Sequence, residues 1–166
     1  MSVSDQSNVL EEFLGNFKSL TLSTIDENNL PFTSYAPFIK HDHKYYIYIS
    51  SIAKHFTNLE KHKNVSLFFI EDENSCENIF ARKRVNLQCD VKKLDRDTEE
   101  FNDLMDLFQD KHGEMISRLK TMTDFYIHEF MPNSGQAIFG FGAAYDIGGE
   151  YCEQLLIRGG THGHKS

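Results

Sequence analysis

Apolar and polar positions along residues 19 to 50 follow a pattern that predicts three successive antiparallel strands. Side chains alternate between two faces in Ser19–Ile25, and the polar turn residues 26 to 29 follow. Pro31 begins the second strand, where its missing N–H does little harm. A second polar turn, at residues 40 to 44, leads into the third strand, Tyr45–Ser50. A meander this rich in aromatic residues favours a sandwich or barrel, because a lone sheet would expose its edges and one apolar face.

Three stretches have the spacing of apolar residues that is typical of helices. Residues 9 to 17 form one apolar stripe, and a shorter stripe at residues 52 to 62 follows possible capping serines at Ser50 and Ser51. The longest predicted helix covers residues 97 to 120. Asp97 is its candidate N-cap and Glu100 stands at the capping-box spacing, while Gly113 interrupts the interior.

The remaining apolar runs predict further strands. Residues 64 to 71 form a nearly continuous apolar run, and residues 85 to 93 alternate in a way that leaves one face wet. Residues 124 to 131 and 136 to 141 are predicted to form a hairpin around the turn Pro132–Gly135. Gly140 and Gly142 flank Phe141, where a backbone or a flat ligand can approach closely. Residues 149 to 157 are expected to form a terminal helix or strand.

Composition limits the class of protein. The 166 residues are expected to form one domain, with an N-terminal helix or arm at 1–14 and a flexible C-terminal loop at 158–166. A net charge of -8 argues against non-specific nucleic-acid binding. No run of about 20 apolar residues is present, so no membrane span is expected. Three cysteines, without a CxxC or a signal peptide, favour a reduced, cytoplasmic location.

Histidines near the C-terminus are the sharpest chemical signal. The chain has no GxSxG elbow, no phosphate-binding glycine loop and no cysteine in a recognisably basic context. His162 and His164 lie in a glycine-flanked tail, and imidazole is the commonest neutral ligand for iron, zinc, copper and nickel. Two histidines do not complete a zinc site, whereas haem needs only one or two protein ligands. An unstructured tail without a ligand is the plain alternative.

Other candidate site residues are less distinctive. Lys54 and His55, beside the short predicted helix, suit either a ligand contact or a subunit contact. Arg82 and Arg84 belong to the only dense cationic group and are either a solvated face or a clamp for a carboxylate or phosphate. Asp124 is either a turn residue or a carboxylate that orients a ligating histidine.

Four stretches together resemble one known family. They are SYAPF at 34–38, NLEKHKNVSLFFIEDE at 58–73, FARKR at 80–84 and GFGAAY at 140–145. This combination is similar to the pyridoxamine-phosphate-oxidase-like split barrel, and specifically to its haem-utilisation branch, the HugZ/HutZ-type haem oxygenases. The resemblance covers roughly residues 15 to 166.

The resemblance implies a mainly β fold with flanking helices, namely a split β-barrel that forms a homodimer with a ligand site at the subunit interface. In the wider superfamily this site takes FMN, and in the haem branch it takes haem b. Position by position, the resemblance makes His162 the iron ligand, with His164 as the alternative, and assigns Arg82 or Arg84 to a propionate. It places Asp124 and the Lys54–His55 segment around the ligand and the interface.

The implied function is that of a cytoplasmic haem oxygenase. The homodimer would open the porphyrin ring with dioxygen and an external electron donor and thereby release iron, so that haem is both cofactor and substrate. Two alternatives stay open: a haem carrier or storage protein without turnover, and an FMN-dependent oxidoreductase, because the segment around Lys54 and His55 keeps a pattern that holds flavin phosphate elsewhere in the superfamily.

Overall fold

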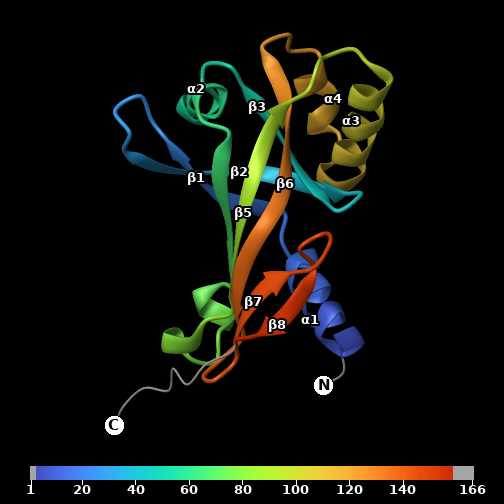
Figure 1. The fold of residues 1–166 in the computed structure, drawn as a ribbon. Helices are drawn as coiled ribbons and strands as arrows, with labels where there is room; N and C mark the ends of the chain where they lie inside the picture. The colour runs from blue at the N-terminus through green and yellow to red at the C-terminus, as the bar shows by residue number, and fades with distance from the viewer. Residues whose placement is uncertain (1–2, 159–166) are drawn as a thin grey trace.

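A computed structural model describes the backbone of residues 3–158 and the side chains of residues 8–158 (Figure 1). Strands dominate, with helices around them. In chain order the elements are α1 (Val3–Gly15), β1 (Ser19–Ile25), β2 (Pro31–His41), β3 (Lys44–Ser50), α2 (Lys54–Lys61), β4 (Asn64–Ile70), the short 3-10 helices η1 (Glu73–Ser75) and η2 (Ile79–Ala81), β5 (Arg84–Lys93), α3 (Glu99–His112), α4 (Met115–Lys120), β6 (Phe125–Ile138), β7 (Ala144–Gly148) and β8 (Gln154–Ile157).

Six of the strands close into a barrel. The order of hydrogen-bonded neighbours is β3-β2-β1-β4-β5-β6-β7-β8, and an additional pairing between β3 and β6 joins the first six into a ring. Closure leaves no free strand edge in that ring. The sequence pattern of residues 19 to 50 indicated such closure, because an open sheet of these aromatic-rich strands would expose its edges. The strands β7 and β8 continue the same sheet from β6 as a short hairpin outside the ring. The sequence-based prediction of a mainly β split barrel with flanking helices is confirmed for the single chain.

The predicted hairpin at residues 124–141 is wrong. These residues contain one continuous strand, β6, which pairs with β5 from His128 to Ile138, across the predicted turn. The register shifts at the predicted turn, since Gln88 pairs with Ser134 while Cys89 pairs with Pro132, and Asn133 is left between them. Pro132 and Asn133 therefore belong to a β-bulge, where an unpaired residue is tolerated and the strand bends.

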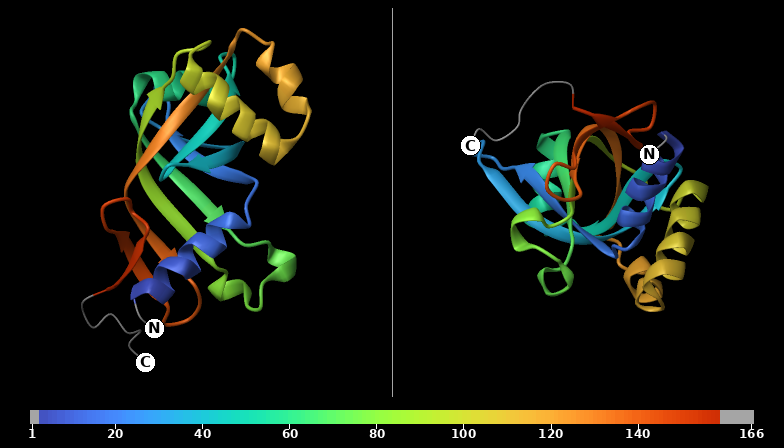
Figure 2. Two further views of the ribbon diagram at one scale, coloured as in Figure 1. Left: turned by 90° about the vertical axis from the view of Figure 1, so that its right-hand side faces the viewer. Right: turned by 90° about the horizontal axis from the view of Figure 1, so that it is seen from below.

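Two hydrophobic cores lie on opposite sides of the barrel wall. The larger fills the barrel and extends to α1, where Phe13 contacts Phe139 edge to face, and Phe17, just after the helix, contacts Phe69 in the same way. The smaller lies between α3 and α4 and the outer surface of the strands beside them, where Phe101 and Phe108 pack against Tyr48. Figure 2 shows α3 and α4 outside the barrel and α1 at its lower end.

The long predicted helix is two helices. Gly113 adopts a φ of 86° and ends α3, so it separates α3 from α4 instead of merely weakening one helix. Thr98, not Asp97, is the N-cap, because its hydroxyl accepts a hydrogen bond from the N–H of Phe101 at 3.1 Å. Within residues 3–158, no helix is long and apolar enough to cross a membrane.

A short helix, α2, covers the upper end of the barrel. It begins after Ala53, which supplies no side-chain cap, so the predicted serine cap is wrong. Phe56 and Leu59 are buried against the strands, and the buried Asn58 amide donates a hydrogen bond to the Thr24 hydroxyl at 2.9 Å. Packing, this hydrogen bond and the polar contacts of Lys54, His55 and Glu60 with the strands and their turns hold α2 in place.

Near the C-terminus, β8 confirms the strand alternative for residues 149–157, although only Gln154–Ile157 are extended. The strand β7 was not predicted from the sequence. It pairs with the end of β6 beyond the bulge, where Gly135 lies opposite Ile147.

Gly135 provides a test of this arrangement. A Cβ at this position would lie 2.5 Å from the backbone oxygen of Asn86 and 2.8 Å from the Leu87 side chain, so backbone would have to shift. We expect Gly135→Ala to lower the free energy of unfolding by about 2–3 kcal/mol. Gly15→Ala, where nothing lies within 4 Å of the added Cβ, is the control. Urea unfolding at one protein concentration measures both, and equal midpoints for the two variants would contradict the described close approach of β5 to β6.

Candidate functional site

His55 stands at the start of α2, where the helix meets β2. Its Nδ1 lies 2.8 Å from the Ser34 hydroxyl, and the tautomer decides which of the two donates. Burial lowers the pKa of His55, so the imidazole is neutral near pH 7. The Ser34 contact fixes the ring and leaves the other nitrogen for a ligand.

Lys54 is already engaged within the chain. Its ammonium lies 3.6 Å from the carboxylate of Asp26 and 4.9 Å from the centre of the Phe32 ring. The Leu30 N–H donates a hydrogen bond to Asp26, and this bond is the main cause that lowers the pKa of the Asp26 carboxyl. An anionic ligand at Lys54 would therefore compete with an ionised carboxylate.

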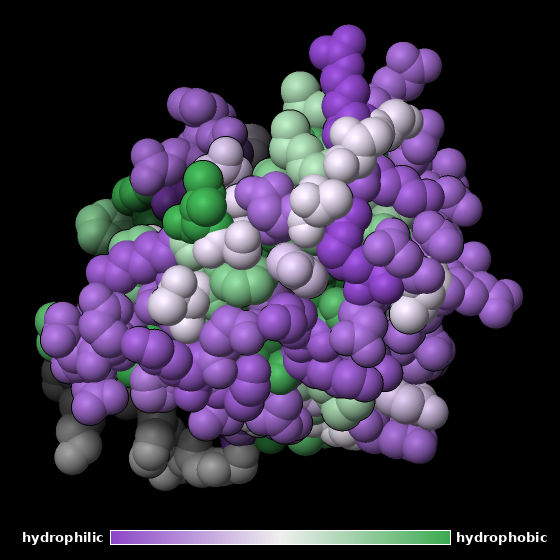
Figure 3. Space-filling model, turned by 90° about the horizontal axis from the view of Figure 1, so that it is seen from above, coloured by the Kyte–Doolittle hydropathy of each residue, from purple (hydrophilic) through white to green (hydrophobic). Residues whose placement is uncertain are grey.

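Asp124 lies at the junction between β3 and β6, close to the start of α2. Its carbonyl oxygen accepts a hydrogen bond from the Ser51 N–H at 2.8 Å, and its carboxylate accepts a longer one from the Ser50 hydroxyl at 3.4 Å. The side chain is exposed. Asp124, Lys54 and His55 thus form an upper group of candidate residues, on a face that is mostly hydrophilic (Figure 3).

Arg82 and Arg84 lie at the other end of the barrel, beside η2 and the start of β5. The guanidinium of Arg82 donates to the Glu71 carbonyl through two nitrogens and to the Glu73 carboxylate through the third. Arg84 donates only one hydrogen bond to a described residue, from Nη1 to the Arg82 carbonyl at 2.8 Å. The guanidinium of Arg82 is held by hydrogen bonds within its own chain, whereas the guanidinium of Arg84 has N–H groups that can still bind a ligand.

The lower end also exposes large apolar side chains, which we call the lower apolar group. It comprises Ile79 and Phe80 of η2, Phe141 of the β6–β7 turn and Ile157 of β8, with exposures from 54% to 84%. Sequence analysis found only Phe141 among them. Phe80 opens the FARKR motif, so its position beside the arginines was a signal that could have been used.

Within one chain the predicted residues do not converge on one place. The strand β5 runs from Arg84 at the lower end to Lys93 at the upper end, a length of about 30 Å. The upper group and the arginines are therefore far apart (Figure 1). His162 and His164 lie outside the described residues. Residues 3–158 contain no cluster of three or more His, Cys, Asp or Glu side chains placed to hold a metal ion.

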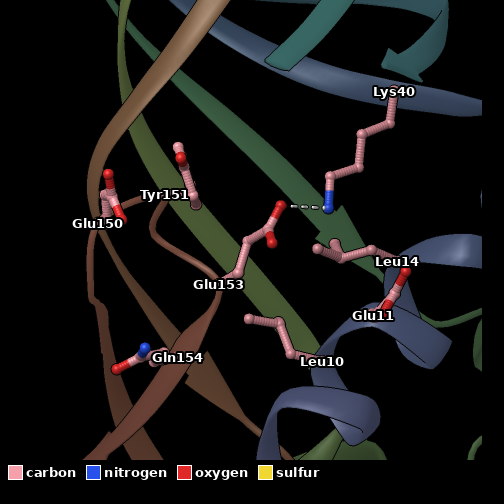
Figure 4. Close-up of a pocket in the computed structure, with 8 residues that line it drawn as sticks. All are labelled: Leu10, Glu11, Leu14, Lys40, Glu150, Tyr151, Glu153 and Gln154. Atoms are coloured by element: carbon pink, nitrogen blue, oxygen red, sulfur yellow. Dashed lines mark ion pairs between the residues drawn. The ribbon is translucent and has the colours of Figure 1, made fainter. Parts of the chain in front are cut away.

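One pocket of the described chain lies away from these residues. It has a volume of about 280 Å³ and opens between α1, β2 and the β7–β8 connection, where Lys40 pairs with Glu153 at 2.9 Å (Figure 4). A larger hollow of about 620 Å³ lies beside it and shares Glu150 and Tyr151. Among the candidate site residues that the structure describes, none lines either cavity.

Between the two groups, the outward-facing side chains of β1, β2, β4 and β5 carry no charge over the middle of the sheet. This outer sheet face consists of Thr21, Ser23, Thr33, Tyr35, Ser66, Phe68, Asn86 and Gln88. Ser66 accepts hydrogen bonds from the Asn86 and Gln88 amides at 2.8 and 3.3 Å. Charged residues make up 25% of the chain, so a face without charge is typical of the centre of a protein–protein interface.

Comparison with protein families agrees with this architecture. A family model described as pyridoxamine 5'-phosphate oxidase matches residues 7–138, which is most of the chain. The chain therefore belongs to the pyridoxamine 5'-phosphate oxidase-like split-barrel superfamily.

Individual relatives narrow the assignment. The haem oxygenase HutZ of Vibrio cholerae is 36% identical over 85% of this chain and 80% of its own length. A crystal structure of V. cholerae HutZ, described as a haem storage protein, has a TM-score of 0.77 and 32% identity over 85% of this chain and 99% of that one. Campylobacter jejuni ChuZ has a TM-score of 0.84 and 29% identity, covering 100% of this chain and 69% of its own. Within the superfamily, this chain is a member of the HutZ-type haem protein family.

The two arginines are predicted to differ in their effect on stability. Arg82→Gln removes a guanidinium that satisfies the Glu71 carbonyl, and we expect it to lower the free energy of unfolding by about 1–2 kcal/mol. Arg84→Gln removes one hydrogen bond and is expected to cost at most about 0.5–1 kcal/mol. Thermal and urea unfolding of both variants measure this difference, and a larger loss in Arg84→Gln would reverse the assignment of roles.

Proposed function

We propose that this protein binds haem b between two copies of the chain and opens the porphyrin ring with dioxygen and electrons from an external donor, releasing iron. The V. cholerae relative is named a haem oxygenase, and its crystal structure is described as that of a haem storage protein. Both names concern haem, and they differ in whether haem is consumed.

The lower end of the chain fits the chemistry of haem. Arg84 presents guanidinium N–H groups that no described residue uses, and a guanidinium fork suits a propionate. The lower apolar group lies at the same end of the molecule and supplies exposed apolar surface for a flat macrocycle. The guanidinium N–H groups of Arg84 that no described residue accepts, at this exposed apolar end, are the single observation that carries the proposal.

In this proposal the iron ligand is His162, with His164 as the alternative. Chain geometry then limits where Asp124 can act. Ile157 pairs with Tyr145, which pairs with Ala137, so β8 ends about 10 Å from the lower part of β6. Asp124 lies about 40 Å away along β6, and an extended chain from Ile157 to His162 spans at most about 18 Å. A chain extended from Ile157 would therefore not carry residue 162 as far as Asp124 of the same chain.

If both residues serve one haem, Asp124 must come from a second copy. The uncharged outer sheet face offers the surface on which two copies would pair, and a twofold axis would generate two equal sites. In each site a carboxylate from one protomer would orient the ligating imidazole of the other and strengthen it as a donor. When bound, the haem iron supplies the site for dioxygen reduction, and the protein supplies orientation, the propionate clamp and shielding from water.

Haem titration followed by turnover tests the function. Anaerobic addition of haem is expected to give a shifted Soret band, which is lost when dioxygen and ascorbate are added, while free iron and an open tetrapyrrole appear. A stable Soret band under these conditions would contradict degradation and favour storage. Arg84→Gln is expected to weaken haem binding about five- to thirty-fold, because a charge-assisted hydrogen bond is lost. The matched control is Lys83→Gln, which removes the exposed cation between the arginines and should change the affinity less than twofold.

Complementation between two inactive variants tests the shared site. Asp124→Asn and His162→Ala are each expected to abolish most turnover. Unfolded together and refolded as a mixture, they form mixed dimers in which one of two sites receives both native residues from different chains. About a quarter of the wild-type sites should then be restored. If both residues came from the same chain, the mixture would stay as inactive as its components.

A further inference from the structure

His128 is a histidine that the proposed function does not use. It lies in β6 beneath α2 with 1% of its surface exposed, and the ring of Phe56 from α2 packs edge-on against it at 5.1 Å between centroids. Neither ring nitrogen has a hydrogen-bond partner. A buried polar group without a partner costs about 1–3 kcal/mol, which an aliphatic side chain would avoid.

Buried polar atoms without a hydrogen-bond partner occur on both sides of the contact between α2 and the barrel. Among the described residues, three buried side-chain polar atoms have no hydrogen-bond partner. They are both nitrogens of His128 in β6 and the Oδ1 of Asn58 in α2. The helix has eight residues and no side-chain N-cap. A short helix that is docked over unsatisfied polar groups is the kind of element that opens locally before the rest of a fold.

Charged groups reach His128 from three directions. On α2, the Glu60 carboxylate lies 3.8 Å from Nε2, too far for a hydrogen bond, and it pairs with the Lys93 ammonium at 3.1 Å. Lys93 of β5 also lies over the rings of Phe56 and Tyr126, and Lys63 comes from the connection after α2. The residue of β3 that pairs with His128 is the apolar Ile47. One carboxylate thus faces two ammonium groups, and a charged imidazole here would be poorly compensated.

We propose that protonation of His128 releases α2. When the imidazole takes up a proton in mild acid, the helix leaves the upper end of the barrel. Opening gives the imidazolium access to water, and the displaced helix carries Lys54 and His55 with it. The consequence for a bound ligand rests on the proposed function, whereas the release itself does not.

The direction of the effect follows from linkage. Burial is the main cause that lowers the pKa of His128 to about 4 in the docked state, against about 6.5 in water. The docked state therefore has its full stability above pH 6.5 and loses stability as the pH falls toward 4. From pH 7.5 to pH 5.0 the ratio of released to docked helix should rise about thirty-fold. Asp26, whose pKa is lowered from an already acidic value, stays ionised at pH 5.0, so its ion pair with Lys54 in the docked state does not titrate between pH 7.5 and pH 5.0.

Amide hydrogen exchange of the full chain without added haem tests this release. Protection factors for residues 54–61, corrected for the intrinsic pH dependence of exchange, are compared at pH 7.5, 6.0 and 5.0, with α3 as the internal reference. The wild-type helix should lose protection about thirty-fold at pH 5.0 while α3 does not change. His128→Leu should remove most of this pH dependence and leave only the smaller contribution of His55, whose pKa is also lowered by burial.

Three results would overturn the proposal. They are a constant protection of α2 in the wild type, the same loss of protection in His128→Leu, and a parallel loss in α3, which would mean global unfolding. Should His128→Leu fail to fold, a proton NMR titration of His128 in the wild type decides instead. Its pKa should lie well below 6, and a value of 6.5 or above would contradict the proposed uptake on release.

Discussion

One continuous strand, β6, is the constraint on which the rest of the structure depends. Its upper part pairs with β3 and closes the barrel, its lower part pairs with β7 of the β7–β8 hairpin, and β5 pairs with residues of both parts. The bulge at Asn133 lets one strand serve both neighbours, because it bends the strand where its partner changes. Without this strand the barrel would be open, and the C-terminal hairpin would have no sheet to join.

The length of β6 also separates the parts of the candidate site. Asp124 precedes the strand at the upper end, while the β7–β8 hairpin directs the chain out at the lower end, near Arg84 and the lower apolar group. The candidate residues of a single chain therefore lie in two separate groups, which the chain does not join. Pairing of two chains through the uncharged outer sheet face is the simplest way to bring an upper end and a lower end together. The two cavities beside α1 and the β7–β8 connection contain none of these residues, which is what a site completed by a second copy would leave in one chain.

Local sequence predicted the elements well where one physical signal dominated. Alternation in Ser19–Ile25 and the apolar run at 64–70 mark strands, because period-two burial leaves few alternatives. Prediction failed where one residue type serves two purposes. Pro132–Gly135 has turn composition, yet a bulge accepts the same residues, and only the pairing partner on β5 decides between them. Both Asp97 and Thr98 suit an N-cap, and the backbone of Asp97, with a φ of 62°, excludes it from that role.

For the candidate site, the sequence identified suitable residue types, and the structure shows which of these side chains are already bound within the chain. Arg82 and Arg84 look equivalent in the motif, but only the folded loop shows that Glu71 and Glu73 occupy Arg82. The sequence likewise indicates no partner for Lys54, whereas in the fold its ammonium lies beside the carboxylate of Asp26 from the β1–β2 connection. Native mass spectrometry of the haem-loaded protein tests the central claim most directly. The account predicts a species of two chains that carries two haems, and a single chain that holds one haem on its own would contradict it.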